Sequence, residues 1–296
     1  MKKSVSLLLA GLMLCGALTG CGGNNSTAEN TDSQTAESTT GTSGAIHVVS
    51  REDGSGTRGA FVELTGVEDD NGDNTTVEAE IANRTDAVLT TVAGNEAAIG
   101  YVSLGSLNDT VKAVTVDGVE ATVDNVKSGD YTLSRPFNIA TKGEPTGVAA
   151  DFIGFIMSAD GQAIVGEDYI TVNDNAEAFT SDGSSGHITV GGSSSVSPVM
   201  EQLIEAYKAV NPNAQIDLQT SDSTSGMAGA MDGTFAIGMA SRELKDEEAA
   251  ELNGQAIAMD GIAVIVNNAN TVENLAMDQI RSIYVGETTD WADVAA

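Results

Sequence analysis

The feature that constrains the fold most is a pattern that occurs three times: a short apolar strand, a turn rich in Gly and Ser, and then a helix. The pattern begins at Ile46, at Ile188 and at Ile216. Such alternation of strands and helices predicts an α/β fold. In open α/β sheets, ligands bind at the carboxyl ends of the strands, where helix N-termini present free N–H groups and the positive end of a dipole. The sequence therefore predicts that the three turns form a site suited to an anion.

The first of these turns carries the most chemistry. It reads Arg51-x-Asp53-Gly54-Ser55-Gly56-Thr57. Its glycines let the backbone approach a ligand closely, and its hydroxyl groups add donors beside the backbone N–H groups. Arg51 offers a planar fork that matches an oxyanion, and Asp53 is placed to orient it. Taken alone, the turn is also explained by the simpler hypothesis of a Gly-rich loop with a surface salt bridge.

The other two turns add further hydroxyl groups. They read Gly192-Ser193-Ser194-Ser195 and Ser221-Asp222-Ser223-Thr224-Ser225-Gly226. Each is typical of a helix N-cap when it is considered singly. Together with the first turn, they predict a convergent shell of small hydroxyl donors.

Composition excludes several classes of function. Lys and Arg number 13 against 43 Asp and Glu, and the net charge of −30 argues against a nucleic-acid partner. A small anion is not excluded, because its capture depends on local donors rather than on net charge. With two Cys and two His in the chain, no metal site built from His and Cys is expected, and no cofactor is expected. A nucleophile motif of the form G-x-S-x-G is absent, so the sequence predicts binding rather than catalysis.

The N-terminus predicts secretion and lipid anchoring. Lys2 and Lys3 precede the apolar run 5–18, which is shorter than the length of about 20 residues that a membrane-spanning helix needs. The run ends in a small-residue cleavage site followed by Cys21, and this arrangement resembles a bacterial lipobox in which Cys21 is lipidated. An ordinary signal peptide with an incidental Cys is the alternative. Residues 22–45 are rich in Ser, Thr, Asn and Gly, which predicts a flexible tether at the outer face of the cell membrane.

Several segments together resemble the phosphate-binding subunit of bacterial phosphate ABC transporters. The segments that carry the resemblance are ITVGGSSSVSP (188–198), SDSTSG (221–226), IGMASREL (237–244), DGIAVIVN (260–267), SREDGSGT (50–57), AIGYVSLG (98–105) and LSRPF (133–137). They cover nearly everything after the tether. Each segment is short, but their combination is specific.

The order of these segments departs from the usual order of that family. Residues 46–172 resemble the second half of the family's chain, and residues 188–296 resemble its first half. The polar segment 173–187 would then join the family's usual C-terminus to its usual N-terminus. We interpret this order as a circular permutation, which folds tolerate when the old termini lie close together. Exchange of halves between two chains, giving a swapped dimer, is the alternative.

The resemblance also implies a set of ligand-binding residues. They are Arg51, Ser55, Gly56, Thr57, Ser194, Ser195 and Ser223. One position departs from the family, because Arg242 follows Ser241 where some members have an Asp that accepts the proton of hydrogen phosphate. Arg242 is expected to add a second cation to the site, and this change puts the rejection of sulfate in doubt. Weaker candidates, some of which could replace the missing acceptor, are Asp53, Asp222 and Thr224.

The implied fold is a two-lobed periplasmic-binding-protein fold of a type II-like architecture, circularly permuted, with the ligand in a cleft between the lobes. The first lobe is expected to combine residues 46–104 with 267–296, and the second to contain residues 105–266. The implied function is capture of inorganic phosphate outside the cytoplasm for the permease subunits of an ABC transporter, by a monomer that meets the membrane only through its lipid. Two alternatives stay open: a binder of another oxyanion such as sulfate or molybdate, and a surface lipoprotein used for adhesion or sensing.

Overall fold

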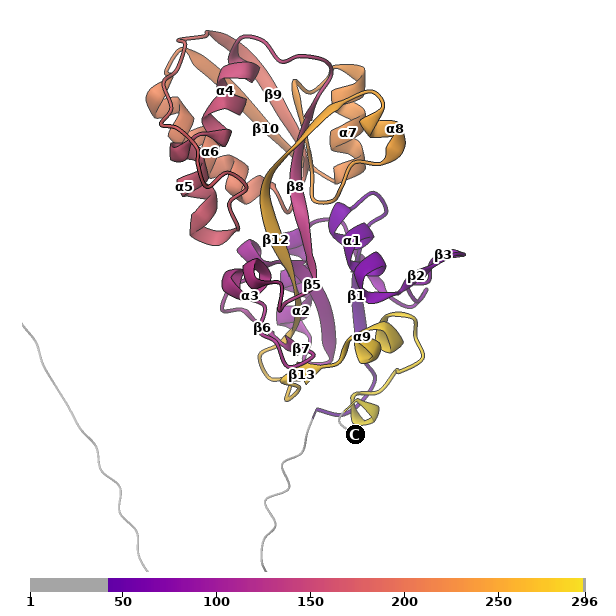
Figure 1. Cartoon of the computed structure of the whole chain (residues 1–296). Coiled ribbons are helices and arrows are strands. Elements are labelled where there is room, and N and C mark those ends of the chain that lie inside the picture. The colour runs from indigo at the N-terminus through magenta and orange to yellow at the C-terminus, as the bar shows by residue number, and fades with distance from the viewer. Residues whose placement is uncertain (1–41, 295–296) are drawn as a thin grey trace, which may run out of the picture. The chain divides into compact units, whose positions relative to one another are not determined.

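The computed structural model describes residues 42–294 of the chain (Figure 1). The expected signal peptide, Cys21 and most of the expected tether lie outside these residues. Within 42–294, no single helix is long and apolar enough to cross a membrane. Only α4 (Val148–Met157) and α5 (Ala159–Asp168) pass such a test together, as a pair bent by 60°.

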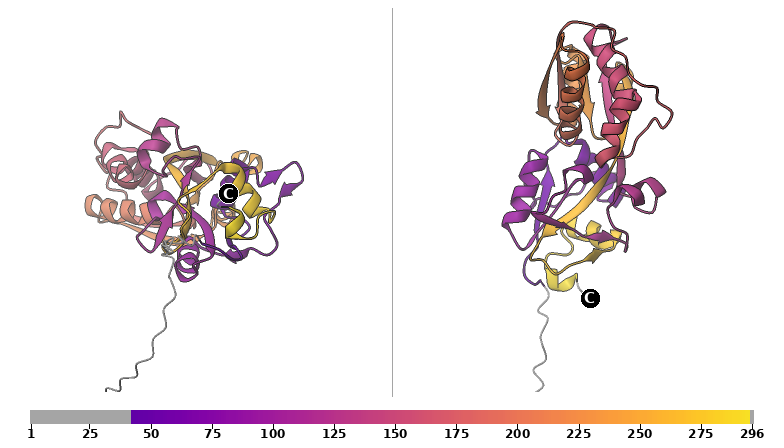
Figure 2. Two further views of the ribbon diagram at one scale, coloured as in Figure 1. Left: turned by 90° about the horizontal axis from the view of Figure 1, so that it is seen from below. Right: turned by 90° about the vertical axis from the view of Figure 1, so that its left-hand side faces the viewer.

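One nine-stranded sheet runs through both lobes, in the order β10-β9-β11-β8-β12-β5-β1-β4, with β6 paired to β12. Two of its strands, β8 (Ser134–Thr141) and β12 (Asn253–Asn267), connect the lobes (Figure 2). Strand β12 pairs with β8 over residues 253–261 and with β5 over residues 262–266. The change of partner at residue 261 marks the point where β12 passes from one lobe to the other.

The first lobe packs helices on both faces of its part of the sheet. Its strands are β1 (His47–Arg51), β4 (Glu80–Ala82), β5 (Ala98–Ser103) and β6 (Val111–Ala113), and its helices are α1 (Gly56–Thr65), α2 (Thr85–Gly94), α3 (Val123–Ser128) and α9 (Met277–Tyr284). Along β12, Ile262 and Val264 join one core with α1 and α9, whereas Ala263 and Ile265 join another with α2. This alternation is the period of a strand buried on both faces.

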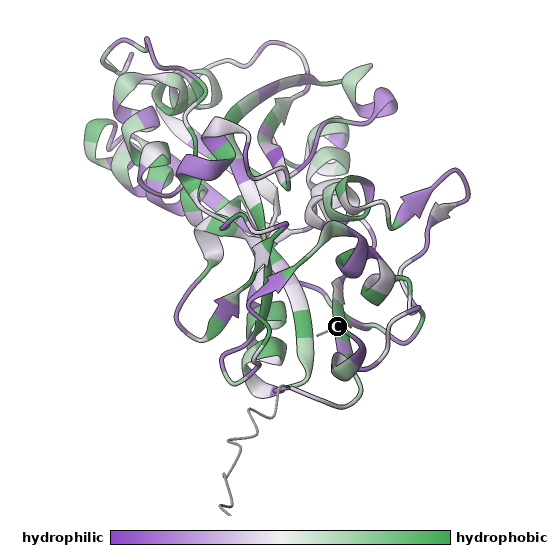
Figure 3. Cartoon of the chain, turned by 60° about the horizontal axis from the view of Figure 1, so that its bottom comes forward, coloured by the Kyte–Doolittle hydropathy of each residue, from purple (hydrophilic) through white to green (hydrophobic). Residues whose placement is uncertain are grey.

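Short elements complete the first lobe. They are β2 (Glu68–Asp69), β3 (Gly72–Asp73), β7 (Thr115–Val116), β13 (Asn274–Leu275), and the 3₁₀ helices η1 (Leu104–Ser106) and η2 (Trp291–Asp293). Strands β2 and β3 pair as an exposed hairpin, which is hydrophilic in Figure 3. The hairpin lies outside the cores described above.

The second lobe has the same layered construction. Its own elements are β9 (Gly186–Ser193), β10 (Ala214–Ser221), β11 (Ile237–Ala240), α4, α5, α6 (Ser197–Val210), α7 (Ser223–Asp232) and α8 (Asp246–Ala249). Helices α4, α5 and α6 cover one face through residues such as Phe152 and Leu203, and α7 covers the other through Met227 and Ala230. The predicted α/β class is therefore confirmed, and so are the three strand–turn–helix units.

The division between the lobes differs from the one expected. Residues 105–133 were assigned to the second lobe, but Val114, Val126 and Leu133 pack in the core of the first lobe with Ile262. The expected boundary followed the polar turn after β5, whereas the chain does not pass from the first lobe to the second until β8. Strand β6 returns from that turn to pair with β12 inside the first lobe, and this long-range pairing is not visible in the local sequence.

The ends of the described chain are held together. Residues 42–45, which were assigned to the flexible tether, contact the C-terminal segment: the backbone N–H of Thr42 donates to Thr271 Oγ1 at 2.6 Å, and Ala45 pairs with Asp290. The tether assignment therefore does not extend to residue 45. Helix α4 begins at Val148, directly after Gly147, whose φ of +56° is a value that favours glycine.

The polar segment 173–187 is anchored to the second lobe through Asp151. Ser181 Oγ and the Asp182 backbone N–H donate to the Asp151 carboxylate at 2.6 and 2.9 Å, and Tyr207 Oη donates at 2.7 Å. Burial raises the pKa of Asp151, but these hydrogen bonds and that from Asn211 outweigh it and hold the pKa below its ordinary value. Asp151 therefore fixes the path of this segment in its ionised form.

Candidate functional site

Four helices begin at one place between the lobes. Helices α1 and α2 come from the first lobe, and α6 and α7 come from the second. Their starts are in contact: Thr57 Oγ1 lies 2.8 Å from Ser195 Oγ, and Thr85 Oγ1 lies 3.2 Å from Ser194 Oγ. Each helix start leaves backbone N–H groups without an intrahelical partner and carries the positive end of a dipole. The meeting point is therefore electrostatically suited to an anion.

Seven hydroxyl groups from these helix starts and neighbouring strand ends form what we call the hydroxyl cluster. Its members are Thr57, Thr85, Ser193, Ser194, Ser195, Ser223 and Ser241. Each exposes 7% or less of its surface. They hydrogen-bond one another over distances from 2.8 Å, between Thr57 and Ser195, to 3.5 Å, between Ser223 and Ser241. The cluster is therefore a buried group of small donors contributed by both lobes.

Arg51 supplies positive charge at one side of the cluster. Its guanidinium donates to Ser194 Oγ at 3.0 Å and to Thr85 Oγ1 at 3.3 Å, so it touches both lobes. It also makes a bidentate pair with Glu52, at 2.7 and 2.8 Å. Arg51 is 2% exposed, and the fixed fork leaves it little freedom to turn away from the cluster.

Arg135, on the connecting strand β8, supplies a second buried cation. Its Nη2 donates to Thr57 Oγ1 at 3.1 Å, and its Nε donates to the carbonyl of Ser241 at 3.0 Å. Asp260, opposite Arg135 on β12, makes an ion pair with Nη1 at 2.9 Å. Burial lowers the pKa of Arg135, and the negative charge of Asp260 partly offsets this shift. Burial also raises the pKa of Asp260 to about 6, although the positive charge of Arg135 acts in the opposite direction. Arg135 thus joins both lobes beside the cluster.

Gly56 allows the two lobes to approach this closely. A Cβ at Gly56 would meet the hydroxyls of Ser223 and Ser241 and would come within 3.0 Å of Arg242 Cγ. The glycine therefore serves a close approach of α1 to the second lobe rather than an unusual backbone angle. This explains why the first turn needs glycine at this position.

The structure brings together five of the residues expected to bind the ligand. Arg51, Thr57, Ser194, Ser195 and Ser223 belong to the hydroxyl cluster or donate to it. Ser55 is buried nearby but caps helix α1, where its Oγ accepts from the Arg58 backbone N–H at 3.3 Å. Ser55 therefore contributes to the helix start rather than to the cluster.

Arg242 does not reach the cluster, contrary to the expectation from the sequence. Its guanidinium makes a bidentate pair with Glu248, at 2.7 and 2.8 Å, and lies 3.4 Å from Thr224 Oγ1. Burial raises the pKa of Glu248, but its bonds to Arg242 and to the Lys245 backbone N–H outweigh it and hold the pKa low. The Arg242 charge is therefore used within the second lobe.

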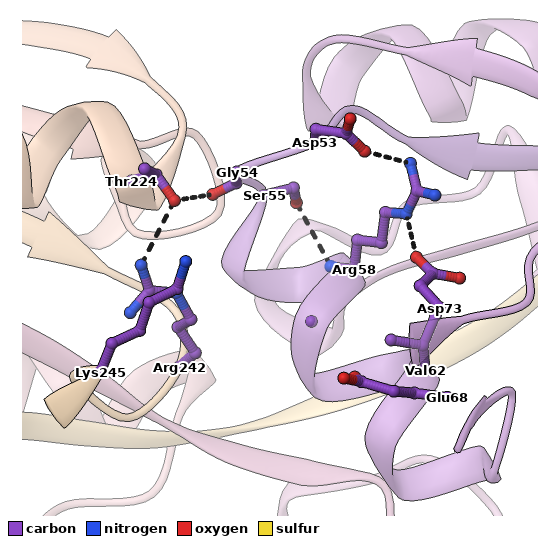
Figure 4. Close-up of a pocket in the computed structure, with 11 residues that line it drawn as sticks. Asp53, Gly54, Ser55, Arg58, Val62, Glu68, Asp73, Thr224, Arg242 and Lys245 are labelled. Carbon is purple, nitrogen blue, oxygen red and sulfur yellow. Dashed lines mark hydrogen bonds and ion pairs between the residues drawn. The ribbon is translucent and has the colours of Figure 1, made fainter. Parts of the chain in front are cut away.

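The three weaker candidates also have other partners, and Figure 4 shows those of Asp53 and Thr224. Asp53 is fully exposed and pairs with Arg58 at 3.1 Å, so it orients Arg58 and not Arg51 as expected. Asp222 caps α7 by accepting from the Ser225 backbone N–H at 2.8 Å. Thr224 bridges the lobes through its bond to the Gly54 carbonyl at 3.2 Å. None of the three hydrogen-bonds a cluster hydroxyl within residues 42–294.

A pocket of about 180 Å³ lies beside the cluster at the edge of the cleft (Figure 4). Its lining includes Gly54 and Thr224 from the facing loops, together with Arg58, Arg242 and Lys245. Arg58 donates to Asp73 at 2.7 Å, so its charge is offset within the pocket wall. The pocket thus reaches the facing loops that border the cluster.

Four members of the site were not among the ligand-binding residues expected from the sequence, although Ser193 lies in one of the turns predicted to supply hydroxyl donors. Thr85 begins α2 after a strand of three residues, which is too short to show the strand–turn–helix pattern. Arg135 lies inside a strand pattern, where nothing distinguishes an inward-pointing Arg. Ser193 and Ser241 lie at strand ends next to residues that were named, and their positions at the carboxyl ends of β9 and β11 were the available signal.

The arrangement can bind an oxyanion through its hydroxyl and guanidinium donors. Both histidines of the chain lie at the surface, where His47 and His187 pair with Glu80 and Asp217. Within residues 42–294, no group of three or more His, Cys, Asp or Glu side chains could hold a metal ion. The two-lobed fold and the donor-rich site between its lobes define a binding protein for a small anion.

Comparisons with known proteins give the family. The PBP superfamily domain matches residues 25–160 and 177–296. "Phosphate-binding protein PstS 2" of Streptococcus agalactiae is 46% identical over 301 residues, covering 99% of this chain and 98% of that protein. The structure of a phosphate-binding protein of a phosphate ABC transporter from Streptococcus pneumoniae has a TM-score of 0.69 at 45% identity, covering 85% of this chain and 100% of that one. "Phosphate-binding protein PstS" of Bacillus subtilis is 35% identical over 134 residues, covering 44% of this chain and 42% of that protein.

The chain therefore belongs to the PBP superfamily and, within it, to the PstS family of phosphate-binding proteins. The resemblance stated from the sequence is confirmed at the level of the family and of the fold.

Proposed function

We propose that this chain captures inorganic phosphate between its lobes and presents it to a phosphate ABC transporter. The observation that carries the proposal is the hydroxyl cluster, which is buried at the starts of four helices and flanked by Arg51 and Arg135. The names of the similar proteins from Streptococcus agalactiae and Streptococcus pneumoniae support phosphate as the ligand. The mechanism is binding without chemistry.

Binding follows from fixed donors around a desolvated anion. The hydroxyls of the cluster turn from one another to the anion, and Arg51 adds a charge-assisted bond. Because Thr57 and Thr85 lie on one lobe and Ser194 and Ser223 on the other, the anion gains its full set of bonds only when the lobes are together. Phosphate therefore favours the closed arrangement by the contacts that exist only there.

The place of action and the partners follow from the same function. Substrate-binding proteins of ABC transporters work outside the cytoplasm, and we propose that lipid on Cys21 holds this one at the outer face of the membrane. The permease subunits of the transporter would receive phosphate from a monomer. Labelling with radioactive palmitate tests the anchor: the full chain should be labelled and Cys21→Ser should not, while equal labelling of both would exclude Cys21.

We further propose that the chain is circularly permuted relative to part of its family. Its order agrees with that of the Streptococcus agalactiae relative over nearly the whole length, whereas the match to the Bacillus subtilis relative stops after 134 residues. The anchoring of segment 173–187 on Asp151 supports a joint between former termini at that place. A rearranged chain that begins at Ser184 and joins residues 294 and 46 by a short linker should fold and bind phosphate. Failure of this chain to fold would contradict the proposal.

Calorimetry tests the proposed ligand directly. The full chain titrated with phosphate should bind one equivalent, and Arg51→Ala should lose most of the affinity. Arg84→Ala is a matched control, because Arg84 is an exposed arginine whose ion-pair partner within residues 42–294 is Asp86. Absence of phosphate binding by the natural chain would refute the function, and equal affinity of the two variants would refute the site.

A further inference from the structure

The hydrogen bonds of the hydroxyl cluster have a preferred direction, which is set by the neighbouring N–H groups. A hydroxyl group offers one proton to donate and two lone pairs to accept. An N–H that donates to the oxygen occupies one lone pair and, by polarising the group, makes its own proton the better donor. The direction of each hydroxyl in the cluster can therefore be inferred from whether an N–H already donates to it.

Five of the seven hydroxyls receive such an N–H. The donors are Arg135 Nη2 to Thr57 at 3.1 Å, Arg51 Nη1 to Thr85 at 3.3 Å, the Ser195 backbone to Ser193 at 3.3 Å, Arg51 Nη2 to Ser194 at 3.0 Å, and the Ser241 backbone to Ser223 at 3.1 Å. All five hydroxyls are thereby biased to donate their protons. This gives the site a surplus of donors.

Ser195 and Ser241 are the two members that receive no N–H on their hydroxyl oxygens within residues 42–294. Ser195 Oγ lies next to two of the biased donors, Thr57 at 2.8 Å and Thr85 at 3.2 Å. Ser241 Oγ lies next to three: Ser193 at 3.0 Å, Thr57 at 3.3 Å and Ser223 at 3.5 Å. When an anion draws these donors away, Ser241 is the oxygen that loses the most partners.

Carboxylates take no part in the cluster. Glu52 is occupied by Arg51, and Asp260 faces Arg135. In the part of the chain that the structure describes, no carboxylate oxygen hydrogen-bonds a cluster hydroxyl. The two hydroxyls that are not biased to donate, those of Ser195 and Ser241, are therefore the candidate acceptors for the proton of hydrogen phosphate.

We propose that Ser241 accepts the proton of bound hydrogen phosphate, and that the site consequently binds sulfate within about tenfold of phosphate. The proposal rests on the proposed function of the same site. A carboxylate can only accept, so it would repel an anion that has no proton. A serine hydroxyl can reverse its direction, accepting from hydrogen phosphate and donating to sulfate, so it keeps a hydrogen bond with either ligand.

The test compares phosphate and sulfate by calorimetry on the full chain at equal ionic strength and neutral pH. The natural chain should bind both anions with affinities within about tenfold of each other. Ser241→Asp should weaken sulfate relative to phosphate by at least about a hundredfold, because the new carboxylate accepts from one ligand and repels the other. Thr57→Val is the matched control: it removes a donor and should weaken both anions by similar factors.

Each outcome decides between the alternatives. Tight phosphate binding with sulfate rejected about a thousandfold or more by the natural chain would overturn this inference and leave the proposed function intact. If the natural chain binds neither phosphate nor sulfate, both this inference and the proposed function are overturned. If Ser241→Asp does not fold, Ser241→Ala replaces it. The ratio of phosphate to sulfate affinity should then fall, because hydrogen phosphate loses the acceptor for its proton whereas sulfate loses one donor among several. If the ratio of phosphate to sulfate affinity is unchanged in the folded Ser241 variant, or if it changes in Thr57→Val, then Ser241 is not the proton acceptor.

Discussion

Removal of the Arg51 side chain should lower phosphate affinity by about 10²- to 10⁴-fold. The side chain is 2% exposed and donates to Ser194 and Thr85, so its loss removes one of the two buried cations that touch both lobes. Its loss also leaves Glu52, a largely buried carboxylate, without its bidentate partner and close to the bound anion. Loss of one partner of a buried, hydrogen-bonded charge pair, here Arg51 and the bound anion, costs about 3–5 kcal/mol of binding free energy, which corresponds to this factor.

A double-mutant cycle separates the two causes. Phosphate affinity is measured by calorimetry for Arg51→Ala, for Glu52→Gln and for the double variant. If the abandoned carboxylate contributes, the double variant should bind more tightly than Arg51→Ala alone, by about 0.5–3 kcal/mol. Glu52→Gln alone should bind phosphate at least as tightly as the natural chain. The reasoning is refuted if Arg51→Ala stays within about fivefold of the natural chain, which corresponds to only about 1 kcal/mol.

Three further predictions concern closure, anchoring and pH. Gly56→Ala should weaken phosphate binding about 5- to 100-fold by calorimetry, because overpacking against Ser223 costs about 1–3 kcal/mol; Gly59→Ala, whose new Cβ would meet Arg242 Cδ at an ordinary contact distance of 4.0 Å, is the control and should bind normally. Asp151→Ala should lower the free energy of unfolding in urea by about 2–4 kcal/mol, because it removes the acceptor of four donors, two of them in segment 173–187; a loss below about 0.5 kcal/mol would contradict this role. The pKa of Asp260, raised to about 6 in the fold from 3.8, contributes up to about 3 kcal/mol of stability at low pH that is lost as pH rises from about 4 to 6; melting curves of Asp260→Asn should lack this dependence, and identical pH profiles would exclude it.

The parts of the fold that are local in sequence could be predicted, and those that depend on distant pairing could not. The three strand–turn–helix units follow from short apolar runs and glycine, and β1, β9 and β10 lie where those runs place them. The lobe boundary after β5 could not be located, because it depends on the pairing of β6 with β12, about 150 residues further along the chain. Strand pairing over such a separation leaves no local signal.

The same distinction applies to the site. Arg51, Thr57 and Ser194 lie in turns rich in Gly and Ser. Their composition predicts that the backbone approaches a ligand closely and that hydroxyl groups donate to it. Arg242 has an equally suggestive position, but the carboxylate of Glu248 on α8 turns its guanidinium away from the cluster. Arg135 enters the site from the middle of a strand, and only its opposition to Asp260 across β8 and β12 shows why a charge is tolerated there. The sequence gives the type of each residue in the site, but it does not show in which direction each side chain points.

A crystal structure of the full chain grown with phosphate tests the central claim most directly. The account predicts one phosphate between the lobes, within hydrogen-bond distance of Arg51, Thr57, Ser194 and Ser223, with Arg242 still paired to Glu248. Phosphate bound only in the pocket beside Arg58, or bound nowhere in a chain with its lobes together, would contradict the account.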